Sequence, residues 1–352
     1  MNSGNFDTIN NLHSMIKFFS IATFATLLVG AVLMAFAQTN SPVNRTAATL
    51  SNVDPEQPEE LGLVHWQRDL DKGKAEAEKT GKPLLILFQE VPGCSNCTRY
   101  GNVTLSHPLI VEAIETYFVP VCIYNNKGGK DRDALQTFNE PAWNNPVVRV
   151  VGSDYSDVVP RIANFNSPAQ LVRGIRNTLQ ATQQTVPAYI DLLFEELSAR
   201  EAGLETATFS MYCFWSGEAT FGNIPGVIET EPGFQDGKEV VKVQFNPSIV
   251  QKSDLEAATQ PKGIQACSRN GGFSSDREPK YYLAQTDYKF IPMTSLQACR
   301  ANALAGKNRK PDELLSPRQL AMLEKVQQNP KKKYKNAIGV SDLKKSWAAL
   351  SE

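Results

Sequence analysis

The chain has 352 residues, enough for about two domains with connecting segments, and 21% of its residues are charged, an ordinary globular composition. Its formal net charge of −1 gives no electrostatic reason to expect a nucleic-acid partner. The three histidines are His13, His65 and His107, so residues 108–352 contain none. The C-terminal two-thirds therefore cannot build a Ser-His-Asp triad or a histidine-rich metal site, unless the first part of the chain reaches over.

Residues 1–37 have the pattern of a targeting segment. Lys17 precedes the uncharged stretch 18–37, and the small-x-small pattern at its end predicts cleavage after Ala37, with Gln38 as the new first residue. The stretch is also long enough to span a bilayer, so an uncleaved anchor is the alternative. In both cases we expect export to the periplasm or cell envelope, with possible membrane association through the N-terminus. An oxidising compartment makes cysteine pairing plausible.

Residues 38–60, rich in Asn, Thr, Pro and Glu, are predicted to be a linker, and residues 61–182 an α/β domain. The expected elements of this domain are a helix that ends at Gly81, a buried strand at 84–88, a Cys-x-x-Cys turn, a helix at 107–117, a strand at 118–124, a further helix, a strand entered through Pro146 and a helix capped by Ser167.

A connecting helix is predicted within residues 183–205, and a second unit, of α+β type, over residues 206–305. The expected elements of this unit are strands at 206–210, 227–234 and 239–245, helices at 252–260 and 294–305, and an extended segment at 276–290. Residues 306–352 are predicted to form a C-terminal extension with two peripheral helices.

Cys94 and Cys97 form a Cys-x-x-Cys motif at a predicted strand-to-helix turn. There the helix N-terminus favours the thiolate of Cys94, and Cys97, one turn further on, can close a disulfide with it. We predict a redox-active pair, with a purely structural disulfide as the alternative. A zinc site would need two more ligands, and the sequence has no second pair of this kind, so no metal is expected. Cys122, in the second strand, is expected to be a buried apolar residue.

These elements resemble a thioredoxin-like domain. The resemblance rests on Gly-Lys-Pro at 81–83, on Cys94 and Cys97, and on Pro146, which stands at the position of the family's cis-proline. It implies that Pro146 faces the motif and helps to bind the backbone of a peptide or partner cysteine. Residues 93–97 read Gly-Cys-Ser-Asn-Cys where the family usually has Trp-Cys-Gly-Pro-Cys, and the intervening pair tunes the redox potential.

Cys213 lies at a second predicted strand-to-helix junction, in the sequence YCFWSGE. The adjacent Phe214 and Trp215 can form an apolar box around a methyl or thioether group. Glu239 begins an alternating strand, and if that strand neighbours the one leading to Cys213, its carboxyl can act as a proton donor in an apolar pocket.

Asp276 and Tyr281 lie five residues apart and can add hydrogen bonds at the same place. Taken singly, an aspartate of this kind is more often a surface carboxylate than a binding residue, and a tyrosine of this kind is more often simply half-buried. On the residues alone, the favoured interpretation is a structural disulfide between Cys267 and Cys299 with a buried Cys213.

Residues 206–305 resemble a peptide methionine sulfoxide reductase of the A type, the class that acts on the S epimer. The resemblance rests on the order and spacing of Cys-Phe-Trp, Gly-Phe, Lys-Glu-Val-Val and Asp-x4-Tyr. It implies that Cys213 attacks the sulfoxide sulfur and that Glu239 protonates the sulfoxide oxygen. The residues implied to bind the substrate are Phe214, Trp215, Asp276 and Tyr281.

The sequence departs from this family at three places. Ser-Met-Tyr stands at 210–212 where the family has glycines before the cysteine, and Ser216 replaces a glycine. The segment that precedes Glu239 is short and lacks the tyrosine that the family directs at the sulfoxide oxygen. Tyr212 and Tyr282 are the candidate replacements.

The combined prediction is an exported oxidoreductase with a thioredoxin-like domain followed by a ferredoxin-like, mixed-sheet reductase domain. It would reduce methionine S-sulfoxide in oxidised proteins or peptides through a cysteine sulfenic acid, which Cys267 or Cys299 resolves. Cys94 and Cys97 would then reduce the resulting disulfide at high effective concentration, and an upstream dithiol would recharge them. No cofactor beyond these thiols is expected.

Two other interpretations compete with this one. The chain could be a thiol-disulfide oxidoreductase whose second domain is a degenerate, non-catalytic peptide-binding module. It could also be a non-enzymatic envelope scaffold with two stabilising disulfides, in which case Cys94 and Cys97 would be inert to reductant.

Overall fold

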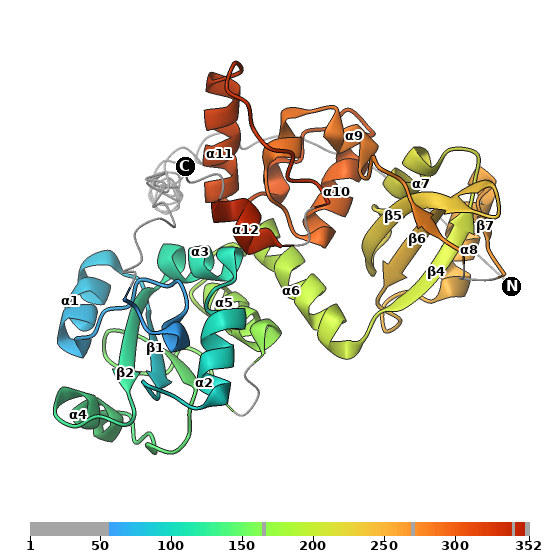
Figure 1. The fold of residues 1–352 in the computed structure, drawn as a ribbon. Helices are drawn as coiled ribbons and strands as arrows, with labels where there is room; N and C mark the ends of the chain where they lie inside the picture. The colour runs from blue at the N-terminus through green and yellow to red at the C-terminus, as the bar shows by residue number, and fades with distance from the viewer. Residues whose placement is uncertain (1–55, 164–166, 269–271, 340–341, 349–352) are drawn as a thin grey trace, which may run out of the picture. The chain divides into compact units, whose positions relative to one another are not determined.

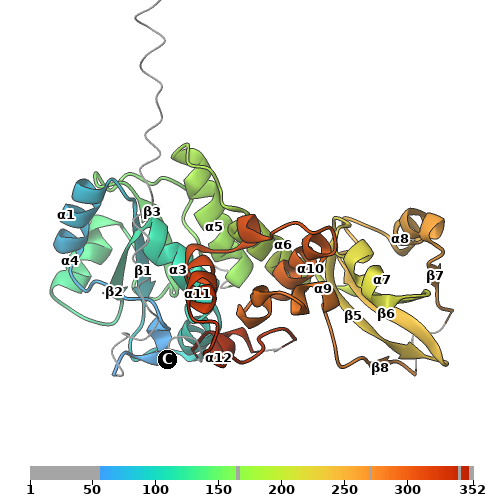
Figure 2. The ribbon, with the colours of Figure 1, turned by 90° about the horizontal axis from the view of Figure 1, so that it is seen from above.

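Two separate β-sheets, each with its own helices, organise the part of the chain that the computed structural model describes (Figures 1 and 2). The described residues are 56–163, 167–268, 272–339 and 342–348. The predicted targeting segment at 1–37 and most of the predicted linker at 38–60 lie outside them. Within these ranges, the structure contains no helix that combines the length and the apolar character needed to cross a bilayer.

The first sheet has the strand order β2-β1-β3, with β1 parallel to β2 and antiparallel to β3. We call residues 56–181 the N-terminal lobe. Its helices and strands are α1 (Leu70–Thr80), β1 (Leu84–Gln89), α2 (Ser95–Arg99), α3 (Pro108–Tyr117), β2 (Val119–Tyr124), α4 (Lys130–Thr137), β3 (Val147–Val151) and α5 (Pro168–Ala181). The predicted order of elements is therefore confirmed in this lobe.

All six residues of β1 are buried, because helices cover both faces of the first sheet. Leu85 and Leu87 face the apolar cluster of α3 and α5, whereas Leu84, Ile86 and Phe88 face the cluster of α1 and α4. This is the alternation expected of a central strand in a three-layer α/β arrangement. The rigid central strand fixes the segment that follows it, which carries the Cys-x-x-Cys motif.

The second sheet has the order β7-β4-β6-β5-β8. We call residues 205–328 the C-terminal lobe. Its helices and strands are β4 (Glu205–Ser210), α7 (Phe214–Phe221), β5 (Val227–Gln235), β6 (Lys238–Phe245), α8 (Lys252–Thr259), β7 (Gln265–Ala266), β8 (Ser274–Ser275), α9 (Tyr281–Ala284), α10 (Ser295–Ala305) and α11 (Pro317–Gln328).

Two expectations for this lobe are wrong. Every strand pair described in the second sheet is antiparallel, not mixed. The crossover through α7 does make β4 and β5 run the same way, but β6, joined to β5 by a hairpin, lies between them. The segment 276–290, expected to be extended, instead contains α9 and a 3-10 turn at Asp287–Phe290. Lys280 starts α9 in the left-handed conformation, with φ of 55°.

Helix α6 (Ala188–Ala202) is the predicted connecting helix, and it contributes to the cores of both lobes. Tyr189 and Leu193 belong to the apolar cluster that contains α3 and α5, and Ala199 packs with Ile228 and Leu296 of the C-terminal lobe. Helices α5 and α6 lie side by side in both views (Figures 1 and 2). One helix therefore contributes side chains to the apolar cores of both lobes.

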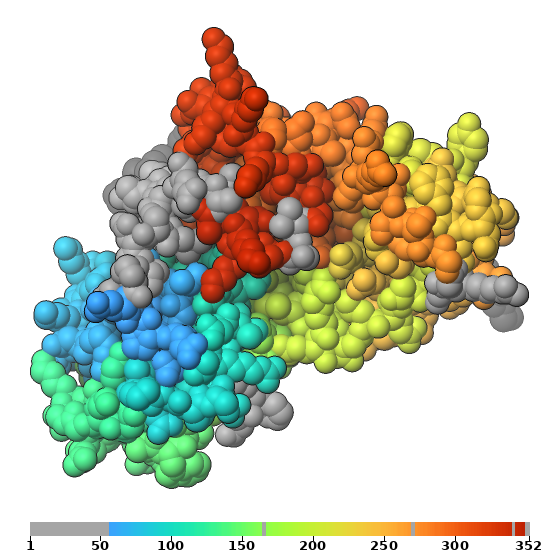
Figure 3. Space-filling model, in the orientation of Figure 1, coloured from blue at the N-terminus to red at the C-terminus, as the bar shows by residue number. Residues whose placement is uncertain are grey.

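The C-terminal helices are less peripheral than predicted. Leu323 and Val326 of α11 are buried in a cluster with Leu283 and Tyr288. In the space-filling view, the red surface of the C-terminal residues lies against the orange surface of the segment that precedes them (Figure 3). In α12 (Leu343–Ala348), Trp347 is 2% exposed and packs in the core of the N-terminal lobe. Burial of these apolar side chains explains the difference from the prediction.

Candidate active site

The Cys-x-x-Cys motif follows β1 and opens helix α2. Cys94 is the N-cap residue of α2 and is exposed, whereas Cys97 lies inside the first turn and is buried. The two sulfur atoms are 3.2 Å apart, and the Cys97 thiol lies 2.7 Å from Oδ1 of Asn145. Because a thiol has one proton, Cys97 can donate either to the carbonyl of Asn145 or to a Cys94 thiolate.

The two thiols of this motif differ in acidity. Burial acts to raise the pKa of Cys94, but the N–H groups of Cys97 and Asn96 and the Cys97 thiol outweigh it, so the pKa is lowered. Burial raises the pKa of Cys97 to about 12, and the Cys94 side chain adds to this effect. An exposed acidic thiol beside a buried protonated one is the arrangement in which the first attacks and the second resolves.

This asymmetry predicts the order of alkylation. In the reduced chain at neutral pH, we expect a short pulse of iodoacetamide to modify Cys94 well before Cys97, because only the thiolate reacts and the lower pKa supplies more of it. Mass spectrometry of the separated peptides measures both rates. Chain unfolded in urea provides the control, in which the two rates should converge. Equal rates in the folded chain, or faster labelling of Cys97, would contradict the assignment.

Proline loops border the motif on two sides. The peptide bonds before Pro92 and Pro146 are both cis. Pro146 therefore has the cis geometry that the resemblance to thioredoxin-like domains implied. Gly93, which replaces the family's tryptophan, lies so close to its neighbours that an added Cβ would be 2.3 Å from the carbonyl oxygen of Glu90. Trp143, two residues before the Asn145 that contacts Cys97, is 82% exposed. Sequence reasoning did not single it out.

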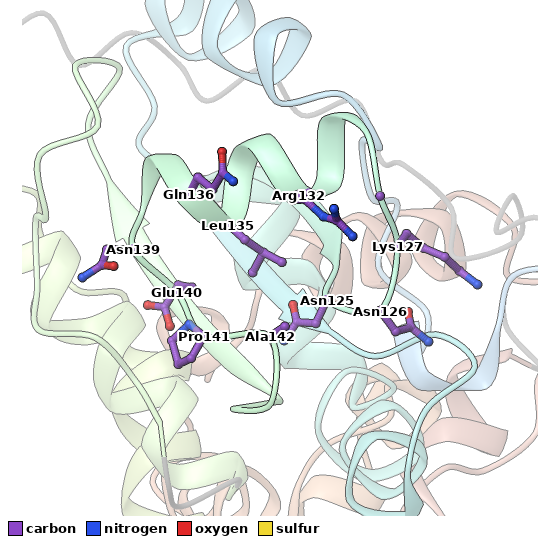
Figure 4. Close-up of a pocket in the computed structure, with 11 residues that line it drawn as sticks. Asn125, Asn126, Lys127, Arg132, Leu135, Gln136, Asn139, Glu140, Pro141 and Ala142 are labelled. Carbon is purple, nitrogen blue, oxygen red and sulfur yellow. The ribbon is translucent and has the colours of Figure 1, made fainter.

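A cavity of about 760 Å³ adjoins these loops, and its lining residues come from α4 and the segments on either side of it (Figure 4). Asn126 accepts a hydrogen bond from Val91 N and donates one to Pro92 O. Asn125 donates to the carbonyl of Asn144, and its Oδ1 has no partner among the described residues. Neither cysteine lines this cavity, so it lies beside the dithiol and does not enclose it.

One group of possible metal ligands lies at the motif in the described part of the chain. Glu90, Cys94 and Cys97 offer ligand atoms within 4.8 Å of one another. A structural zinc site takes four protein ligands, so this group is one ligand short of a complete set. The dithiol interpretation needs no further ligand.

Cys213 occupies the corresponding position in the C-terminal lobe, at the N-cap of α7 after strand β4. It is half-buried, and its thiol is free. Strand β6 pairs with β4, as the prediction required, and carries Glu239 to the same corner. Oε2 of Glu239 accepts the backbone N–H of Phe214 at 2.8 Å, and its carbonyl accepts the N–H of Met211. A carboxylate therefore lies at the start of α7, next to the cysteine.

Aromatic rings line this corner. Trp215 and Tyr281 stack with their centroids 3.9 Å apart and their planes 12° from parallel. Phe214 is buried in the core of the lobe and lies 5.6 Å from Trp215 and 5.3 Å from Phe234, centroid to centroid. The indole N–H of Trp215 has no hydrogen-bond partner among the described residues. The wall next to Cys213 is thus largely apolar.

A buried ion pair attaches α9 to α7 beneath this wall. Oε1 of Glu218, which is fully buried, lies 2.9 Å from Nζ of Lys280, and its Oε2 accepts the Lys280 backbone N–H at 2.8 Å. Thr230 donates its hydroxyl to the same carboxylate. Because Lys280 directly precedes Tyr281, the pair sets the position at which Tyr281 meets Trp215. The sequence resemblance includes Glu218, three residues after Trp215, but assigned it no role, and sequence reasoning did not single out Lys280.

Asp276 is placed less directly. Its backbone N–H donates to Pro232 O, and its Oδ1 accepts the N–H of Glu278 within its own loop. Among the described residues, no hydrogen bond links its side chain to Cys213, Glu239 or Tyr281. The structure therefore brings Cys213, Phe214, Trp215, Glu239 and Tyr281 together, while Asp276 remains bonded to its own loop.

The remaining cysteines are separate from one another. Cys267 is half-buried beside β4, where its N–H donates to Thr208 O. Cys299 is buried on α10, with its sulfur 3.5 Å from Oγ1 of Thr230 on β5. Strands β7 and β5 are three positions apart in the sheet, a distance of about 14 Å at the usual strand spacing. That separation argues against a structural disulfide between Cys267 and Cys299.

Cys122 is buried in β2, as expected for an apolar cysteine. Its side chain packs in the same cluster as the helices α3 and α5. Burial raises the pKa of this thiol well above its usual value, which leaves it in the protonated form.

Comparison with known proteins places a thioredoxin-like domain at residues 65–167, which match a family model of that description. The chain is also similar to peptide methionine sulfoxide reductases. One is MsrA of Methanococcus maripaludis (strain C5), 43% identical over 68 residues, which are 14% of this chain and 43% of that protein. Another is MsrA 1 of Nostoc sp., 32% identical over 79 residues, which are 18% of this chain and 48% of that protein.

A third relative is peptide methionine sulfoxide reductase A5 of Oryza sativa subsp. japonica, 35% identical over 71 residues, which are 16% of this chain and 28% of that protein. The chain thus spans less than half the length of these curated relatives. A thioredoxin-like domain together with this partial similarity suggests a thiol-dependent oxidoreductase.

Proposed function

We propose that the chain reduces methionine S-sulfoxide in proteins or peptides, with Cys213 as the nucleophile. One observation carries the proposal: Cys213 has a free thiol at the N-cap of α7, where the next N–H donates to the Glu239 carboxylate and the residue after that, Trp215, stacks on Tyr281. A nucleophile, an acid and an apolar wall for a methyl group are the parts that sulfoxide reduction needs.

The proposed reaction balances without a cofactor. The Cys213 thiolate attacks the sulfoxide sulfur, and Glu239 donates a proton to the sulfoxide oxygen. This attack joins the two sulfur atoms, and the protonated oxygen then passes from the methionine sulfur to the Cys213 sulfur as the sulfur–sulfur bond breaks. Methionine leaves as the reduced product, and Cys213 is oxidised to a sulfenic acid. A second thiol attacks this sulfur, a disulfide forms, and the oxygen departs as water.

Cys267 is the better placed of the two candidates to be the second thiol. It is half-buried and directly follows β7, the edge strand that pairs with β4, and β4 leads to Cys213. Cys299 is buried, and burial raises the pKa of its thiol. In the proposal, the thiolate of Cys94 next attacks the Cys213–Cys267 disulfide, Cys97 resolves the mixed disulfide, and an upstream dithiol recharges the pair.

Counting products from the full-length chain tests both steps at once. The chain is reduced, freed of reductant and mixed with excess peptide that carries one sulfoxide epimer. We expect two equivalents of methionine from the S epimer, one for each dithiol, and none from the R epimer. The variant Cys94→Ser should yield one equivalent.

Other outcomes separate the alternatives. One equivalent from the unsubstituted chain would support the reductase activity but would contradict electron transfer from Cys94 and Cys97 to the C-terminal lobe. No methionine from either epimer, with Cys94 and Cys97 still exchanging with a peptide disulfide, would support the thiol-disulfide oxidoreductase with a peptide-binding second domain.

A further inference from the structure

A chain of hydroxyl groups leads to the Cys213 sulfur. Oγ of Ser216 lies 3.6 Å from Sγ of Cys213, within hydrogen-bonding distance for sulfur, and 3.2 Å from the hydroxyl of Tyr282. We infer that Tyr282 and Ser216 form a hydrogen-bond relay that stabilises the thiolate of Cys213. The inference deepens the proposed function, because it rests on Cys213 as the nucleophile.

The backbone places Ser216 opposite the sulfur. Cys213 is the N-cap of α7 and Ser216 is the third residue of the helix, the two positions whose side chains reach one another in helix capping boxes. The Cys213 side chain makes no capping hydrogen bond of its own, so its sulfur remains available to accept from Ser216. The family that this lobe resembles has a glycine at this position, which has no hydroxyl to donate.

Packing holds Tyr282 in place. The buried pair of Lys280 and Glu218 anchors the backbone just before it. The ring of Tyr282 lies edge-on to Tyr281, with centroids 5.6 Å apart, and an added Cβ on Gly306 would be 3.1 Å from it. The hydroxyl is therefore directed at Ser216 by a ring that cannot turn freely. Tyr212, the other candidate replacement, is 99% exposed.

The direction of the relay follows from the number of protons. Ser216 and Tyr282 each have one hydroxyl proton. If Ser216 donates to the thiolate, its oxygen is free to accept from Tyr282, and each bond polarises the next. A hydrogen bond to the charged form favours that form. Ser216 thus touches the reacting atom, while Tyr282 acts through it as a positioning residue. In the described part of the chain, the other titratable side chains around the start of α7 are Glu239 on β6, Tyr281 on α9 and the exposed Tyr212, which directly precedes Cys213.

The test measures the pH profile of Cys213 alkylation in the full-length chain, with peptide mass spectrometry to follow this cysteine among the six. In Ser216→Ala we expect the midpoint of the profile to move up by about one pH unit, the lower end of the effect of a hydrogen bond to a charged group. Tyr282→Phe should move it by less. The double variant should move it no further than Ser216→Ala, because Tyr282 acts through Ser216.

Two controls keep the result interpretable. Thr220→Ala removes a hydroxyl from the same helix, one that bonds to Lys262 and not to the cysteine, so its profile should match the unsubstituted chain. Ser216→Thr keeps the hydroxyl, so its midpoint should equal that of the unsubstituted chain. An unchanged midpoint in Ser216→Ala would overturn the relay, and so would a double variant whose shift is the sum of the single shifts. Since alkylation needs no sulfoxide, the outcome is independent of whether the chain reduces one.

Discussion

Replacing Cys213 by serine will reduce the formation of methionine from its S-sulfoxide to the uncatalysed background, even with excess dithiothreitol. A serine hydroxyl is a far weaker nucleophile than a thiolate near neutral pH, and it cannot carry the oxygen away as a sulfenic acid. The substitution should not disturb the fold, because serine is a preferred N-cap residue and Cys213 makes no capping hydrogen bond that could be lost. Chromatographic separation of the product peptide measures the effect.

The matched control for this variant is Cys122→Ala, which removes a buried thiol from the other lobe. We expect it to keep its turnover with dithiothreitol. Residual turnover in Cys213→Ser, at a rate that dithiothreitol alone does not reach, would move the nucleophile to another cysteine. Cys267 would be the first to examine, because it is also accessible and lies beside the strand that leads to Cys213.

The meeting of Cys213 and Glu239 could be predicted from the sequence because it depends on strand register. The hairpin of β5 and β6 fixes where Glu239 lies, and pairing of β6 with β4 sets Val240 opposite Ser210, just before the cysteine. Apolar and polar residues alternate along these strands, and this pattern predicts the register because a slip of one residue would expose the whole apolar face. The Cys-x-x-Cys motif was located by a different signal, the continuous apolar run of β1, which predicted a strand buried on both faces just before the motif.

Contacts that depend on tertiary packing could not be predicted. The pair of tyrosines at 281–282 favours a strand by propensity, but Lys280 adopts a left-handed conformation and its buried ion pair with Glu218 starts a short helix there. The contact of Ser216 with Tyr282 joins residues 66 positions apart and depends on that helix. The order of the strands in the sheet, which separates Cys267 from Cys299, likewise became clear only in the fold.

Replacing Glu239 by glutamine separates its role as an acid from its role at the start of α7. The glutamine carbonyl can still accept the N–H of Phe214, which now donates to Oε2 of Glu239. Loss of the negative charge near the helix N-terminus costs only about 0.3–1 kcal/mol of stability, so the variant should fold. An amide cannot deliver the proton that the departing oxygen needs. We therefore expect single-turnover methionine formation to slow by about 10²–10⁴-fold, the usual contribution of a general acid.

The matched control for this prediction is Glu231→Gln. Glu231 lies on the neighbouring strand β5, where its carboxylate pairs with Lys242 and Ser275 and not with the helix. Losing it changes the charge of the sheet by the same amount, and we expect the single-turnover rate to stay within a few-fold of the unsubstituted chain. If Glu239→Gln proved equally fast, the proton would have to come from elsewhere. The hydroxyl of Tyr282, linked through Ser216 to the sulfur of Cys213, would then be the first donor to test.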